Sequence, residues 1–251
     1  PNAWTAFSAD PALGLVYVPT GNRSPDYYGA HRTAAEDQFA TSLVALDART
    51  GEVRWHFQTV HHDLWDYDNP AQPVLIDATT DSGVAPALIL PTKTGEVFLL
   101  DRRTGEPLTA VEERPALKGD IPTERYAPTQ PWSTGMPNFA KEPLFEKDMW
   151  GATPIDQMLC RIDFKSMRYE GRYTPPSTVK TLQFPGNFGV LNWGSVAVDL
   201  DRNIMIVNSS AMPQYVRLVP RAEAEKQAMS DLKSGHLGLS PQSGTPYAVD
   251  F

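Results

Sequence analysis

The sequence predicts an all-β chain that forms part of a β-propeller, and three observations point to this fold class. Short segments rich in β-branched and aromatic residues recur along the chain, bounded by Gly, Asp, Asn or Pro. The 251 residues include 23 Pro and 17 Gly, which favours turns and long loops over helices. The segments also repeat as strand–turn–strand units, a pattern typical of propellers and solenoids.

The individual elements follow from this pattern in chain order. The clearest strands are predicted at Gly14–Pro19, Ser42–Leu46, Val53–Gln58, Ala87–Leu90, Glu96–Leu100, Ser195–Asp199 and Ile204–Asn208. Helical signals are few, and the best covers Ala222–Lys233, between Pro220 and Gly235. Residues 111–185 interrupt the repeat. Their Pro, Met and aromatic content predicts a long irregular insert that forms a lid over the propeller mouth.

The repeat is clearest in two segments that share one turn. Leu46-Asp47-Ala48-Arg49-Thr50-Gly51-Glu52 corresponds to Leu100-Asp101-Arg102-Arg103-Thr104-Gly105-Glu106. In both, an Asp side chain can accept hydrogen bonds at the start of the turn, and the Gly can adopt a positive φ. A third unit begins at Ser195, so we expect about three to four blades.

Bulk composition excludes some classes of partner. The formal net charge of -8 argues against binding to nucleic acid and against docking on an anionic membrane surface. We find no signal peptide and no apolar run of about 18 residues. The single cysteine, Cys160, lies among apolar residues and is expected to be a buried, inert thiol. The chain opens at Pro1 without an initiator Met, which suggests a piece of a longer protein.

The repeat also predicts where polar and aromatic side chains converge. Six residues occupy equivalent positions at one end of the units: Asn22, Lys93 and Asn208 after a strand, and Trp4, Asp66 and Trp193 before one. Equivalent positions at one end of propeller blades surround the central axis, so we expect these side chains to border one cavity. Each has a plainer alternative as an exposed turn residue or, for Trp4, as core packing.

His61-His62-Asp63 invites a zinc interpretation that its surroundings do not support. Tetrahedral zinc needs several converging ligands, adjacent strand residues point to opposite faces, and no companion cluster is present. We expect a His here to support the Asp66 loop by hydrogen bonding. Thr92-Lys93-Thr94-Gly95 lacks the spacing and the following helix of a phosphate-binding loop, which disfavours nucleotide chemistry.

Several segments resemble the propellers of pyrroloquinoline quinone (PQQ) dehydrogenases. Ala45–Trp55 resembles their tryptophan docking motif, whose Trp packs between adjacent blades. His61–Asp68, followed by Pro70-Ala71-Gln72-Pro73, resembles the catalytic-Asp segment of the membrane-bound glucose/quinate/shikimate dehydrogenases. Further similarity lies in Asp148–Thr153, Met167–Gly171 and Phe184–Asn187. The family has about eight blades behind an N-terminal membrane anchor, so residues 1–251 are expected to be part of one such domain.

The resemblance implies catalytic and metal-binding roles for three residues. Asp66 would be the catalytic base and a metal ligand. Lys93 would donate to the quinone oxygens and stabilise the negative charge that develops there, and would thus serve both catalysis and cofactor binding. Asn22 would place its amide oxygen on the metal, Ca²⁺ or Mg²⁺. Family members usually add a carboxylate from an earlier blade, and it is not within this chain.

Four further residues would bind the cofactor if the resemblance holds. Trp4 would form a flat floor under the planar PQQ ring. Asn192, Trp193 and Asn208 would line the opposite rim with amide hydrogen bonds and apolar surface.

The implied function is the periplasmic oxidation of a sugar or cyclitol hydroxyl by PQQ and a divalent metal. Glucose, quinate and shikimate are the candidate substrates, and electrons would pass to ubiquinone through the membrane anchor of the parent. The alternative is a non-catalytic propeller that serves as a scaffold or assembly protein of the bacterial envelope, since such proteins also carry the docking motif. Open strand edges of a partial propeller predict self-association and weak or absent PQQ binding by the isolated chain.

Overall fold

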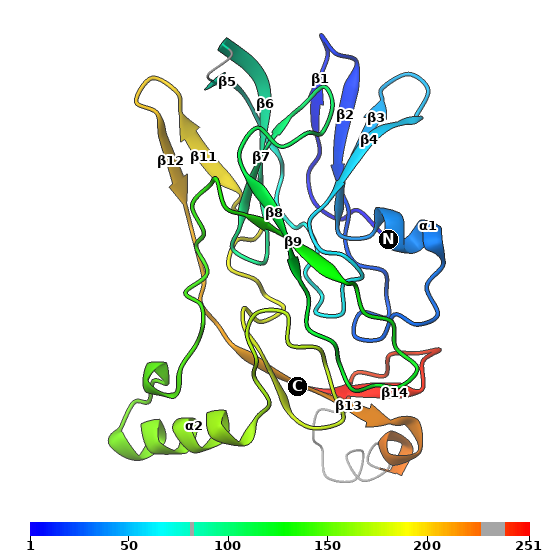
Figure 1. Cartoon of the computed structure of the whole chain (residues 1–251), viewed down its shortest axis with the longest axis vertical. Helices are drawn as coiled ribbons and strands as arrows, with labels where there is room; N and C mark the ends of the chain where they lie inside the picture. Colours follow the sequence, from blue (N-terminus) through cyan, green and yellow to red (C-terminus); the bar gives the residue numbers. More distant parts are fainter. Residues whose placement is uncertain (81–82, 227–238) are drawn as a thin grey trace.

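The computed structural model describes residues 1–80, 83–226 and 239–251, and three antiparallel sheets lie side by side across it (Figure 1). The first has the order β1-β2-β3-β4, with β1 at Ser8–Asp10, β2 at Leu15–Pro19, β3 at Ser42–Asp47 and β4 at Val53–Gln58. The second has the order β5-β6-β7, with β5 at Val74–Thr80, β6 at Gly83–Pro91 and β7 at Val97–Asp101. The third pairs β11, Val196–Asp199, with β12, Ile204–Val207.

The two repeated turns adopt the predicted conformation. Asp47 Oδ1 accepts hydrogen bonds from two following backbone N–H groups at 2.9 and 3.0 Å, and Asp101 Oδ1 accepts one at 2.8 Å. Gly51 and Gly105 have φ values of 74° and 77°, a region that favours glycine. The Asp side chain therefore opens each turn and the Gly completes it.

Trp55 packs between the first two sheets, as the docking motif implies. It belongs to a core cluster that draws residues from both sheets, namely Leu15, Tyr17, Leu43, Ala45, Leu88, Leu90, Phe98 and Leu100. A Cβ on Gly105, which follows β7, would lie only 2.5 Å from Trp55 Cε3. The indole ring thus lies directly against the backbone of the next sheet, where its burial stabilises the contact between blades.

A second core joins the middle sheet to the third. Buried Ile89 and Val97 of the middle sheet pack with Val196 of β11 and with Val190 and Leu191. The sheets therefore pack on one another in chain order, as successive blades do. The predicted all-β partial propeller is confirmed.

The predicted insert, residues 111–185, is more regular than expected. It contains a hairpin of β8, Val111–Pro115, and β9, Thr129–Ser133. The 3₁₀ turn η1, Glu146–Asp148, the helix α2, Pro154–Ser166, and the short strand β10, Thr181–Gln183, follow. A capping box at Thr153 and Asp156 begins α2. Since α2 has no buried residue, Cys160 is exposed, and the prediction of a buried thiol is wrong. The lid role stays a prediction.

The remaining elements complete the described chain. The short helix α1, Ala34–Phe39, lies between β2 and β3 in sequence, and β13 pairs with both β10 and β14. The strand β13 spans Gln214–Pro220, and β14 spans Tyr247–Asp250. Residues 221–226 are helical, and the rest of the predicted helix Ala222–Lys233 lies outside the described residues. Within the described ranges, no helix has the length and apolar content needed to cross a membrane.

Candidate active site

Asp66 lies in the loop between β4 and β5, and Asp63 holds the backbone of that loop. Asp63 Oδ1 accepts from the Trp65 N–H, and Oδ2 accepts from the Tyr67 N–H and the Thr41 hydroxyl, each at 2.8 Å. Burial raises the pKa of Asp63 to about 6. These bonds stabilise the loop around Asp66, whose backbone has a positive φ of 60°.

Lys93 comes from the turn between β6 and β7 and reaches the same loop. Its Nζ donates to the backbone oxygen of Asp66 at 2.7 Å and lies 3.5 Å from Asp66 Oδ1. The Lys93 side chain is 6% exposed and the Asp66 side chain 22% exposed. Gly189 lies against the stem of Lys93, because a Cβ at Gly189 would approach Lys93 Cγ to 2.5 Å. The turn and Gly189 together direct the ammonium group toward Asp66.

Asp68 connects three of the predicted site residues, although the sequence analysis quoted it only as part of a segment. Its Oδ2 lies 3.5 Å from Lys93 Nζ and accepts a hydrogen bond from Trp4 Nε1 at 3.2 Å. Its Oδ1 accepts from the backbone N–H of Asn22. The signal that could have identified Asp68 is that it is the third carboxylate, after Asp63 and Asp66, in one short segment.

Two amide side chains border these carboxylates. Asn187 Nδ2 donates to Asp66 Oδ2 at 3.3 Å, while its buried Oδ1 has no hydrogen-bond partner among the described residues. Asn22 Oδ1 accepts from the Arg23 N–H at 2.7 Å, and its Nδ2 donates to the Asp26 carbonyl at 3.1 Å. Asn22 therefore joins the site through its backbone and Asp68, whereas Asn187 contacts Asp66 directly.

The electrostatic environment increases the proton affinity of the Asp66 carboxylate. Burial raises the pKa of Asp66 well above its ordinary range, the Lys93 ammonium opposes this shift, and the carboxyls of Asp68 and Asp26 add to it. A carboxyl with increased proton affinity is suited to accept a proton from an alcohol.

Trp4 and Trp193 form an exposed aromatic ledge beside Asp68. Their ring centroids lie 5.6 Å apart with a 52° tilt, and they are 39% and 72% exposed. Asn192 is engaged in its own turn, where it donates to the Phe188 carbonyl at 2.6 Å and accepts from the Trp193 N–H at 2.9 Å. Asn208 is exposed, and no side-chain hydrogen bond joins it to the described residues. The structure thus brings Trp4 and Trp193 together, but among the described residues no hydrogen bond links the Asn208 side chain to the site.

His62 ties the Asp66 loop to neighbouring elements, in agreement with the expected supporting role. Its Nδ1 lies 3.0 Å from Asp37 Oδ1 of α1, and its Nε2 lies 3.1 Å from Glu124 Oε1 in the β8–β9 connection. In the part of the chain that the structure describes, no group of three His, Cys, Asp or Glu side chains is arranged to hold a metal.

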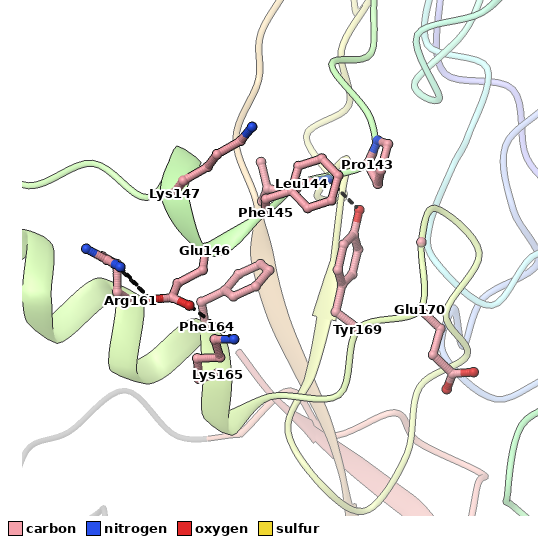
Figure 2. A pocket seen from close by; sticks show the side chains of 11 residues that line it. Pro143, Leu144, Phe145, Glu146, Lys147, Arg161, Phe164, Lys165, Tyr169 and Glu170 are labelled. Atoms are coloured by element: carbon pink, nitrogen blue, oxygen red, sulfur yellow. Dashed lines mark hydrogen bonds and ion pairs between the residues drawn. The ribbon is translucent and has the colours of Figure 1, made fainter.

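The largely apolar hollow in Figure 2 lies on the insert. It has a volume of about 650 Å³ between η1, α2 and Tyr169, and Glu146 bridges Arg161 and Lys165 at its edge. None of the predicted site residues lines it. The predicted chemistry therefore belongs to the Asp66 loop and not to this hollow.

The residues around Asp66 include donor groups of the kinds that a quinone cofactor and a hard cation use. Asp66, Asp68 and Asn187 Oδ1, which has no hydrogen-bond partner in the described part of the chain, are oxygen donors of the kind that Ca²⁺ and Mg²⁺ prefer. Lys93 offers a cation for quinone oxygens, and the exposed Trp4 ring offers a surface for a planar group.

Comparison with known proteins decides the family. All of residues 1–251 match the family model described as the β-propeller domain of PQQ glucose/ethanol/alcohol dehydrogenases. This chain belongs to the PQQ dehydrogenase propeller family. The resemblance inferred from the docking motif and the Asp66 segment is therefore confirmed.

The relatives of this PQQ dehydrogenase propeller are longer enzymes. It is 45% identical over 259 residues to the quinate/shikimate dehydrogenase (quinone) of Acinetobacter baylyi, with 99% of this chain and 31% of the relative covered. It is 43% identical over 252 residues to the quinoprotein glucose dehydrogenase of Escherichia coli K12, covering 99% and 32%. The chain thus spans about a third of the length of these relatives.

A solved structure agrees with the fold of this propeller. The quinohemoprotein alcohol dehydrogenase of Pseudomonas putida HK5 superposes with a TM-score of 0.56 at 25% identity, over 86% of this chain and 27% of that chain. The match supports a partial propeller that corresponds to one portion of a larger ring.

Proposed function

We propose that this chain is part of a periplasmic, PQQ- and divalent-metal-dependent dehydrogenase that oxidises a hydroxyl of a sugar or cyclitol. Glucose, quinate and shikimate are the candidate substrates, and ubiquinone, reached through the membrane anchor of the parent, is the proposed electron acceptor. The observation that carries this proposal is that the carboxylates of Asp66 and Asp68 both lie 3.5 Å from the ammonium nitrogen of Lys93. Relatives named as quinate/shikimate and glucose dehydrogenases support the substrate class.

The residues of the chain would divide the chemistry between them. Asp66 accepts the proton of the substrate hydroxyl at a carboxylate oxygen, and its buried setting increases its proton affinity. Lys93, held by the Asp66 carbonyl, presents a fixed ammonium group that stabilises developing negative charge. PQQ, when bound, would supply an electron-poor quinone as the two-electron oxidant. Trp4 provides a flat face for that ring, and we keep Trp193, Asn192 and Asn208 as proposed rim residues.

A divalent metal would be held by oxygen donors at the same place. Asp66 and Asn22 are the proposed ligands, and Asn187 is a third candidate because its buried Oδ1 is unpartnered among the described residues. Ca²⁺ and Mg²⁺ both accept carboxylate and amide oxygens. Such a metal would supply Lewis acidity.

The test is a titration of the full-length apoprotein with PQQ and either Ca²⁺ or Mg²⁺, followed by a dye-reduction assay with glucose and quinate. We expect saturable PQQ binding and turnover of at least one substrate. Asp66→Asn should lower kcat by about a thousandfold or more, because it removes the proton acceptor. Asp201→Asn, an exposed Asp without a hydrogen-bonded side chain among the described residues, is the matched control and should retain activity.

The second candidate function, a non-catalytic envelope scaffold, makes a different prediction. A scaffold has no need for a shared ammonium between two loop carboxylates beside an exposed Trp pair. Full-length protein that neither binds PQQ nor oxidises these substrates would favour the scaffold and end the enzymatic proposal.

A further inference from the structure

A second cavity opens beside the candidate active site. It has a volume of about 680 Å³ and lies between residues 23–26 with His31 on one side and residues 240–244 on the other. Two hydrogen bonds connect it to the site, because Asp68 accepts from the Asn22 N–H and Asn22 Nδ2 donates to the carbonyl of Asp26, a lining residue. A molecule in this cavity would therefore lie next to the Asp66 loop.

The lining of the cavity combines one guanidinium with hydroxyl-binding groups. Arg23 Nε pairs with Glu36 Oε1 at 2.5 Å, and no other side-chain contact joins its guanidinium to the described residues. The two Nη groups thus remain available, in the planar fork that matches a carboxylate. Asp26 and Gln242 add carboxyl and amide groups that hydrogen-bond to alcohols.

Two guanidinium groups act on this cavity, although the Asp26 carboxyl also lines it. Burial and then the guanidinium groups of Arg32 and Arg23 lower the pKa of His31, a lining residue. A carboxylate is attracted to the Arg23 guanidinium, whereas a neutral polyol gains little from its charge.

We propose that this cavity binds the carboxylate end of a polyhydroxy acid and that Arg23 is the residue that binds this carboxylate. The substrate hydroxyl at the other end of the molecule then reaches Asp66. The proposal rests on the dehydrogenase function above and selects, within it, acidic polyols over neutral sugars. The guanidinium binds the anion, and no bond is made or broken in the cavity.

The experiment compares quinate, which carries a carboxylate, with glucose, which does not, in the full-length protein loaded with PQQ and metal. We expect Arg23→Gln to lower the ratio of kcat/KM for quinate to kcat/KM for glucose at least about tenfold, mainly through a higher KM for quinate. Arg23→Lys keeps the charge but loses the fork, so it should restore part of the ratio. Arg49→Gln, in the exposed β3–β4 turn, is the matched control and should leave the ratio unchanged.

Glu36→Gln separates binding from folding effects. A Gln at this position can still accept from Arg23 and complete the capping box of α1, but it removes the competing negative charge. The quinate ratio should hold or rise. If Glu36→Gln lowered the quinate-to-glucose ratio as much as Arg23→Gln does, the proposal would be overturned. An unchanged ratio in Arg23→Gln would overturn it as well, while glucose oxidation would still support the dehydrogenase function. Loss of PQQ binding and of turnover with both substrates in the unmodified protein would instead reject the proposed function and the cavity proposal with it.

Discussion

Lys93 Nζ lies 3.5 Å from Asp66 Oδ1 and equally far from Asp68 Oδ2, so one ammonium group serves two carboxylates of the same loop. When both carboxylates are ionised, the cluster carries a surplus negative charge in a largely buried setting. A divalent cation or a proton relieves that surplus. The two carboxylates therefore depend on a single fixed countercharge, which makes Lys93 central to the electrostatics of the loop.

Asp68 is expected to organise the cofactor surface. Asp68→Asn keeps the size of the side chain but removes its charge, which weakens its contact with Lys93 and its hydrogen bonds from Trp4 and Asn22. We expect PQQ affinity in the full-length protein to fall about tenfold, or about 1.4 kcal/mol. Tryptophan quenching during PQQ titration measures this, with Asp201→Asn as the control. Equal affinities in the two variants would contradict the role of Asp68.

Gly189 is expected to tolerate no side chain. In Gly189→Ala the new Cβ would meet Lys93 Cγ at 2.5 Å and would also sit at a positive φ of 75°. Gly51→Ala is the matched control, since Gly51 has φ 74° and open space around it. We expect Gly51→Ala to lower the free energy of unfolding by about 1 kcal/mol, from backbone strain alone. Gly189→Ala should lose about 2 kcal/mol more. Urea unfolding of the full-length protein measures both changes in unfolding free energy. Equal changes would show that the Lys93 side chain moves aside without a loss of stability.

The strands of the repeat could be predicted from the sequence because local signals agree there. Asp47, Thr50 and Gly51 set one turn, and the same residue types set the next, so β3, β4 and β7 were predicted to within a residue or two. The strand β5 was missed, although it pairs with β6 along its whole length, because its sequence lacks a repeat partner that would identify it.

The site and the insert were less predictable, for different reasons. The convergence of Asp66 with Lys93 followed from the repeat, but Asp68 is defined by contacts to Trp4 and Asn22, which lie 64 and 46 residues away. Burial of Cys160 was predicted from apolar neighbours, yet α2 packs none of its faces into the described core. Composition reports which residues are apolar, and only the tertiary packing decides whether they are covered.

Glu96 is expected to make stability fall as pH rises from about 4.5 to about 7. Its Oε2 lies 3.2 Å from Arg172 Nη1, and Arg172 also pairs with Glu142, so a buried and a half-buried carboxyl share one guanidinium. Burial raises the pKa of Glu96 to about 7, against the attraction of Arg172. The folded state therefore holds a proton that the unfolded state has released, and unfolding free energy declines over this window by up to about 3 kcal/mol.

Urea unfolding of the full-length protein at pH 5 and pH 8 measures this decline. Glu96→Gln, which cannot ionise, should flatten the dependence, and Glu112→Gln on the exposed face of β8 should leave it unchanged. An identical pH dependence in the protein with and without Glu96 would assign the effect to other groups.

The outer face and edge of β12 are expected to drive self-association of the 251-residue chain. Met205 and Val207 pack into the core, whereas Ile204 and Ile206 on the opposite face are 47% and 64% exposed, and β12 pairs with β11 alone among the described strands. Exposed apolar strands with a free edge favour pairing with another chain. Ile206→Lys should weaken this self-association at least about tenfold, since it places a charge in the contact. Ile155→Lys on α2, where the Ile is 66% exposed, is the matched control and should leave association unchanged. Sedimentation velocity over a concentration series measures the self-association of each variant. A chain that stays monomeric at high concentration would contradict the predicted contact through β12.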